Sequence, residues 1–188
     1  MPSPETTAAQ ALPTPIGRAS STARLIASVG VGVAAAGAIA RFGFGAKGLI
    51  AACFASVLIV LAAVDLERRI IPNRIVLPAT AVIMVAQIAH APGRTPEWIL
   101  ASVGTALFLF LPSLIRKNAM GMGDVKLGLL LGAGLGKHVL TGVTLGFLAV
   151  WPVAIVLFVR RGRDGVRDTA IPLGPFLAAG ALVALFLD

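Results

Sequence analysis

Apolar residues dominate seven stretches of the chain, and charged residues gather in the short segments between them. Most of these stretches are close in length to the roughly 20 apolar residues that a helix needs to cross a bilayer. The expected helices cover residues 25–40, 48–64, 75–91, 98–115, 125–136, 139–159 and 171–187. The pattern therefore predicts an all-α fold, a polytopic bundle of about seven transmembrane helices.

The composition favours the same conclusion. Of the 188 residues, 57% are hydrophobic and only 13% are charged, whereas soluble domains carry about 25% charged residues. Residues 1–22 are rich in Pro, Ser, Thr and Ala and have no apolar period, so we expect a disordered tail there. The expected helices and their short loops fill residues 23–188, which we treat as one transmembrane domain without a separate soluble unit.

The first apolar stretch has two interpretations. It is short, rich in Gly and Ala, and ends in Ala38-Ile39-Ala40, which resembles the small-residue site where a signal peptide is cleaved. It also fits a first transmembrane helix whose small residues let neighbouring helices pack closely. We favour the helix, and the sequence leaves cleavage open.

The net charge of +8 comes from basic residues placed in the loops. If the short stretch 125–136 crosses the membrane, twelve of the sixteen basic residues fall on one side, and four fall on the other: Arg41, Lys47, Arg94 and Lys137. Cytoplasmic loops carry such an excess, so seven spans are predicted, with the amino terminus in the cytoplasm and the carboxyl terminus outside. The charge is therefore explained by a lipid bilayer as partner, and nucleic acid is not expected.

The stretch 125–136 is too short to span the hydrocarbon region of a membrane by itself. Gly128, Gly132 and Gly136 recur every four residues on one helix face, where they permit close approach of neighbouring helices. We therefore expect this segment to be tucked inside the bundle rather than to face lipid.

Two acidic residues lie at expected helix ends on the predicted cytoplasmic side. Asp65 ends the second helix, and Asp124 begins the fifth, 59 positions later, directly after Gly121-Met122-Gly123. A charge in a membrane-embedded segment is costly and suggests function. The other acids lie in the tail, on the outer side, in basic loops or at the last residue. We predict that Asp65 and Asp124 meet and form a catalytic pair; the alternative is that each is only a helix-end charge.

Two nearby carboxylates support hydrolysis because they do not both ionise easily, so one keeps its proton while the other acts as a base. The base would activate a water that attacks a peptide carbonyl. The acid would protonate the carbonyl oxygen and later assist the leaving amine. This chemistry needs neither a metal nor a cofactor, and the pair titrates as a unit, so the two roles stay unassigned.

The motif Gly121-x-Gly123-Asp124-x-Lys126, with the earlier Asp65 and Ile71-Pro72-Asn73, resembles the prepilin peptidases, membrane aspartyl proteases of the GxGD class. The late sequence Ile-Pro-Leu-Gly-Pro-Phe at 171–176 also resembles the last-helix signature of that family, and the likeness covers roughly residues 48–188. The resemblance implies a catalytic pair, Asp65 and Asp124, with supporting motif residues Gly121, Gly123, Lys126, Pro72 and Asn73. Taken by itself, Lys126 fits a topology charge better than a catalytic group.

The resemblance also implies a substrate and a place. Prepilin peptidases remove the basic leader of type IV prepilins or pseudopilins at the cytoplasmic face of the inner membrane, usually after a glycine and before an apolar segment. Longer members carry a cytoplasmic insert, often with paired cysteines, that is linked to N-methylation of the new amino terminus. This sequence has one cysteine, Cys53, and no long loop, so it resembles the short, peptidase-only form of Tad/Flp-type systems.

Two other classes of membrane protein are alternatives to this interpretation. GxGD proteases of the presenilin or signal-peptide-peptidase kind place the partner Asp after a Tyr and carry a late Pro-Ala-Leu, but this sequence has no Tyr and no such motif. A small proton- or ion-coupled transporter or assembly protein would also use intramembrane acids. That alternative predicts acids near the middle of the bilayer, whereas these lie at helix ends.

Overall fold

The computed structural model describes residues 21–115, 120–167 and 172–187. These residues form seven α-helices: α1 (Ser21–Phe42), α2 (Ala46–Arg68), α3 (Asn73–His90), α4 (Thr95–Ile115), α5 (Met122–Leu135), α6 (Val139–Arg167) and α7 (Gly174–Leu187). Short 3₁₀ turns, Pro92–Arg94 and Gly136–His138, precede α4 and follow α5. No strand occurs in the described ranges, so the predicted all-α bundle is confirmed.

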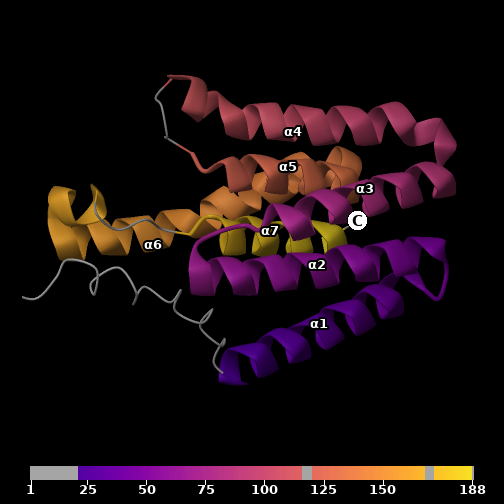
Figure 1. Ribbon diagram of the computed structural model, residues 1–188, viewed down its shortest axis with the longest axis horizontal. Coiled ribbons are helices and arrows are strands. Elements are labelled where there is room, and N and C mark those ends of the chain that lie inside the picture. The colour runs from indigo at the N-terminus through magenta and orange to yellow at the C-terminus, as the bar shows by residue number, and fades with distance from the viewer. Residues whose placement is uncertain (1–20, 116–119, 168–171, 188) are drawn as a thin grey trace, which may run out of the picture.

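Successive helices run in opposite directions along the long axis of the molecule (Figure 1). The contacts of α5 with α4 agree with this arrangement, because Gly128 lies against Ala106 and Gly132, one turn later, lies against the earlier Ser102. With alternating directions, the end of each even-numbered helix and the start of each odd-numbered helix lie at one end of the bundle. The last turn of α2 and the first turn of α5 therefore lie at the same end.

Four helical stretches are long and apolar enough to cross a membrane: Ala46–Arg68, Asn73–His90, Pro92–Ile115 and the continuous stretch Met122–Val156, which contains both α5 and the first part of α6. Two shorter apolar helices, Ala27–Phe42 and Gly174–Leu187, accompany them. These features describe a multi-pass membrane protein. The number of helices matches the expected seven, and how many of them cross the bilayer stays a prediction.

The short helix α5 lies inside the bundle, as its length and glycines predict. It contacts α2, α3, α4, α6 and α7, and half of its residues are buried: Leu127, Gly128, Leu130, Leu131, Gly132, Ala133 and Leu135. Gly136 ends the helix with a φ of +53° and lies against Trp98 of α4. All three glycines of the four-residue repeat thus face α4.

Several predicted helix boundaries are wrong. The helix α2 continues past Asp65 to Arg68, so this aspartate lies within the last turn rather than at the end. The expected loop at 160–168 is largely helical, because α6 continues to Arg167. Charged residues end an apolar pattern but not a helix, since Arg is a good helix former and no proline interrupts this stretch. The helix α1 begins at Ser21, and the rest of the expected tail, residues 1–20, lies outside the described residues.

Candidate active site

Asp65 is buried at the carboxyl-terminal end of α2, with only 6% of its surface exposed. The helix ends at Arg68 and is capped by Arg69, which adopts the left-handed conformation with a φ of +53°. The N–H of Arg69 donates to the backbone carbonyl oxygen of Asp65 at 2.8 Å. Such a left-handed cap satisfies a carbonyl that would otherwise lack a partner, and here the non-glycine cap turns the chain directly beside the aspartate.

Asp124 lies in the first turn of α5. Gly121 precedes the helix in an extended conformation, and its carbonyl oxygen accepts a hydrogen bond from the N–H of Asp124 at 3.0 Å. A negative charge is stabilised at a helix amino terminus by the exposed N–H groups and the helix dipole. A Cβ at Gly121 would lie 3.2 Å from Oδ2 of Asp124, so the aspartate side chain folds back toward this glycine.

The structure brings these two side chains together in one cleft of about 190 Å³, lined by Asp65, Arg69, Ile70, Ile71, Gly121, Gly123 and Asp124. They are near enough for the charge of Asp65 to act on Asp124. The cleft opens at one end of the bundle, between the α2–α3 connection and the start of α5. Its two carboxylates come from segments far apart in the sequence.

Gly123 closes one wall of the cleft. A Cβ at this position would lie 3.0 Å from Cβ of Ile71, a buried residue in the α2–α3 connection. A side chain here would push the connection away from α5, so close approach requires glycine.

The remaining predicted motif residues lie beside the cleft and are not part of its lining. Pro72 caps the start of α3, where its carbonyl oxygen accepts hydrogen bonds from the N–H groups of Ile75 and Val76 at 3.0 and 3.1 Å. Lys126 Nζ donates to Asn73 Oδ1 at 2.8 Å, which joins α5 to the first residue of α3. The predicted set is therefore contiguous: Asp65, Asp124, Gly121 and Gly123 line the cleft, and Pro72, Asn73 and Lys126 lie beside it.

One neighbour of the carboxylates is not among the site residues predicted from the sequence. Gly174, the first residue of α7, lies against Asp65, and its backbone hydrogen-bonds to the Asp65 carboxyl group. A Cβ at Gly174 would lie 2.5 Å from Oδ2 of Asp65. The signal was present in the sequence, since Leu173-Gly174-Pro175 belongs to the late motif, but the motif alone gave it no partner.

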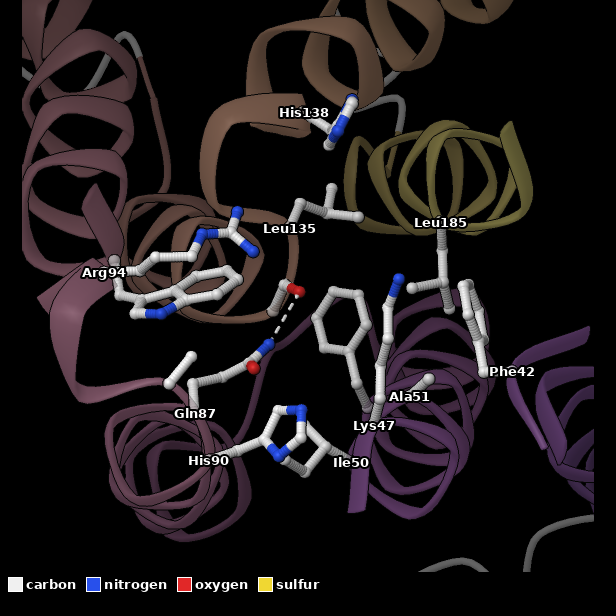
Figure 2. Close-up of a pocket in the computed structure, with 14 residues that line it drawn as sticks. Phe42, Lys47, Ile50, Ala51, Gln87, His90, Arg94, Leu135, His138 and Leu185 are labelled. Atoms are coloured by element: carbon white, nitrogen blue, oxygen red, sulfur yellow. Dashed lines mark hydrogen bonds between the residues drawn. The ribbon is translucent and has the colours of Figure 1, made fainter. Parts of the chain in front are cut away.

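A second cavity, of about 150 Å³, lies at the opposite end of the bundle, among the end of α3, the start of α4 and the end of α5. Figure 2 shows the residues that line it. Both histidines of the chain, His90 and His138, line it together with Lys47, Arg94 and Gln87, whose Nε2 donates to the carbonyl oxygen of Gly134 at 3.3 Å. No Asp or Glu is among its lining residues. This cavity cannot supply a pair of carboxylates, so the cleft at Asp65 and Asp124 is the candidate active site.

No group of three or more His, Cys, Asp or Glu side chains gathers within residues 21–115, 120–167 and 172–187.

The chain is similar to the prepilin leader peptidase/N-methyltransferase of Xanthomonas campestris, with 32% identity over 154 residues, which cover 78% of this chain and 52% of that protein. Proteins of the same description from Burkholderia pseudomallei and Bacillus subtilis share 32% and 29% identity, over 82% and 87% of this chain and 52% and 62% of theirs. The chain thus spans about half the length of the curated relatives it matches. No solved structure matches it significantly.

The strongest finding is a match to the sequence profile of the type IV leader peptidase family over residues 52–160. This range covers more than half of the chain and includes both aspartates of the cleft. The predicted resemblance is confirmed: the chain belongs to the type IV leader peptidase family.

Proposed function

We propose that this protein is an aspartyl endopeptidase of the inner membrane that cleaves the basic leader from type IV prepilins or pseudopilins at the cytoplasmic face. The observation that carries the proposal is the single cleft shared by Asp65 and Asp124, which come from α2 and α5 and belong to the matched family region. The relatives named above, described as prepilin leader peptidases, supply the substrate class.

The cleft supports a mechanism in which a water lies between the two carboxylates. The ionised carboxylate takes a proton from the water as the water oxygen attacks the peptide carbonyl carbon. The protonated carboxyl group donates its proton to the carbonyl oxygen, and a tetrahedral intermediate forms. In the collapse of this intermediate the C–N bond breaks, and the carboxyl group that took the water proton gives it to the leaving nitrogen. The other carboxylate takes a proton from a hydroxyl group of the intermediate, which becomes the new carboxyl product. The pair ends with one shared proton, as it began, so the cycle closes.

The position of the cleft suits a substrate with a charged leader and an apolar helix. Exposed apolar residues lie next to cleft residues along the chain, Leu66 after Asp65 and Met122 between Gly121 and Gly123, and the exposed Ile70 lines the cleft itself. A substrate helix in the bilayer can reach the cleft from the lipid side, while its basic leader stays at the anionic cytoplasmic surface. Cleavage would then occur at the boundary between leader and helix.

The proposal is tested by co-expressing the protein with a prepilin from the same genome and following the size of the prepilin on a gel. Asp65→Asn and Asp124→Asn are each expected to abolish cleavage, because one carboxylate cannot serve as both base and acid. Glu67→Gln is the matched control: it removes an acid from the same turn of α2, where the side chain is exposed and does not line the cleft. It is expected to cleave normally.

The amounts of all variants in the membrane must be equal for this comparison to count. Cleavage by either Asn variant would overturn the paired-aspartate mechanism. If the intact protein shortens no prepilin or pseudopilin of its genome, the peptidase function is wrong, and the transporter alternative becomes the one to test through its dependence on the proton gradient.

A further inference from the structure

Two motif residues outside the cleft make a direct contact whose purpose the proposed chemistry does not explain. Lys126 Nζ donates to Asn73 Oδ1 at 2.8 Å. Asn73 is the first residue of α3 and follows Asp65 by eight positions, while Lys126 follows Asp124 by two. Each partner of the hydrogen bond thus lies a short way along the chain from one aspartate.

Three contacts, of which this hydrogen bond is one, hold the α2–α3 connection in place beside the cleft. The α2–α3 connection is held to α2 by the hydrogen bond from the N–H of Arg69 to the carbonyl oxygen of Asp65. Its middle is held by Ile71, which is buried against Gly123. Its far end is held to α5 by the bond between Asn73 and Lys126. The connection that leads away from one aspartate is therefore fastened to the helix that carries the other.

The surroundings of Lys126 argue against a direct electrostatic role. Residues two positions apart on a helix do not face each other, so Lys126 points away from the side of α5 that presents Asp124. Lys126 does not line the cleft, and it makes no ion pair with any carboxylate in the described ranges. A lysine side chain loses much rotamer freedom when it is fixed in one geometry, yet here the ammonium group is directed onto a neutral amide of another helix.

We propose that Lys126 and Asn73 form a positioning pair that sets the separation of the two carboxylates by holding the start of α3 against the start of α5. This inference rests on the proposed function, because the separation matters only if Asp65 and Asp124 share one reaction. It gives a joint purpose to the Lys of the GxGDxK motif and the Asn of the Ile-Pro-Asn motif, which the sequence presents as unrelated.

The kinetic test uses removal and conservative variants of both partners. Asn73→Ala and Lys126→Met are each expected to lower kcat for prepilin cleavage about 10- to 100-fold, the scale of small misplacements of reacting groups, with KM changed less than about twofold. The double variant is expected to lose no more than the worse single variant, because both remove one contact. Asn73→Asp and Lys126→Arg keep an acceptor and a donor, and are expected to retain most activity.

Arg74→Met is the matched control, since it removes an exposed basic side chain next to Asn73 without touching the contact. It is expected to cleave normally. The positioning pair is refuted if the double variant shows the product of the two single losses, or if Asn73→Asp is as impaired as Asn73→Ala. It is also refuted if Lys126→Met displaces the pH profile of kcat while Asn73→Ala does not, because Lys126 would then act through its charge.

A second measurement does not depend on activity or on complete stability of the variants. Cysteines placed at positions 65 and 124, in a protein whose single Cys53 is replaced by Ala, report the separation of the two sites by cross-linking with a short bifunctional reagent. We expect efficient cross-linking with Lys126 and Asn73 present and a clear decrease with Lys126→Met. An unchanged yield would overturn the inference. If instead Asp65→Asn or Asp124→Asn still cleaves prepilin, the proposed function has failed, whatever the cross-linking shows.

Discussion

Asp65 is held by contacts from segments that are distant in sequence. It lies in the last turn of α2, while Gly174 of α7, 109 positions later, lies against its carboxyl group. Burial of a carboxylate requires hydrogen bonds that replace water, and the backbone of Gly174 supplies one. The absence of a side chain at position 174 is what permits this approach, so this glycine serves the site although it carries no chemical group.

Gly174→Ala is therefore expected to impair cleavage without removing any reactive atom. The added methyl group would lie 2.5 Å from Oδ2 of Asp65, so the carboxyl group must rotate or α7 must move. We expect a loss of about tenfold or more in the rate of prepilin cleavage. Gly104→Ala is the control, because a methyl group there meets nothing within 4 Å. Equal activity of the two variants would contradict the assigned contact.

Some residues of the candidate site can be identified from the sequence, and others cannot. Asp65 and Asp124 were identifiable because an acid in an apolar segment is unusual and needs a reason. Gly174 could not be assigned a partner, since its role depends on a contact between α2 and α7 that no local pattern encodes. The hydrogen bond between Lys126 and Asn73 cannot be predicted for the same reason, since in the sequence alone Lys126 fits a charge that sets membrane topology.

At the scale of elements, the packing of α5 against α4 decides where Asp124 lies. A methyl group at Gly132 would overlap backbone atoms of Ala101 and Ser102. The Ser102 hydroxyl donates to the carbonyl oxygen of Leu129 at 2.9 Å in the same interface. Close contact between backbones, made possible by small residues, is a principal source of helix association in membranes.

Gly132→Ala is expected to destabilise the bundle, because backbone atoms cannot move aside as the end of a side chain can. Overpacking of this kind costs about 1–3 kcal/mol, so the thermal unfolding midpoint in detergent should fall by several degrees. Gly32→Ala is the matched control in α1, where a methyl group meets nothing within 4 Å and alanine favours the helix. A midpoint for Gly132→Ala equal to that of Gly32→Ala would show that α4 and α5 do not pack this closely.

Helix existence was easier to predict than helix ends. The seven apolar stretches each correspond to one helix, but the ends of α2 and α6 were placed where the apolar pattern stops. Hydrophobicity reports where lipid or the core begins, whereas a helix continues until its backbone is capped. For α2 that cap is Arg69 in the left-handed conformation. This conformation is usual for glycine or asparagine at a helix end, so the sequence does not predict it at an arginine.

At the scale of the whole molecule, the two ends of the bundle differ in chemistry. One end holds the two carboxylates, and the other holds the cavity lined by both histidines, Lys47 and Arg94. The excess of basic residues in the loops at the carboxylate end predicts that this end faces the cytoplasm. This predicted orientation rests on the distribution of charge along the sequence. Because successive helices alternate in direction (Figure 1), the cleft lies at the end that carries the basic loops.

This orientation predicts which end a membrane-impermeant maleimide can reach. Phe44 is 92% exposed and lies in the α1–α2 connection at the histidine end. In a Cys53→Ala background, Phe44→Cys should be labelled in cells whose outer layers have been made permeable while the inner membrane stays intact. A cysteine at Glu67, which is exposed near the carboxylates, should be labelled only in inverted membrane vesicles. The reverse pattern would put the cleft outside, where a leader still attached to a cytoplasmic precursor could not reach it. Cytoplasmic cleavage would then be untenable, even if Asp65 and Asp124 were a competent pair.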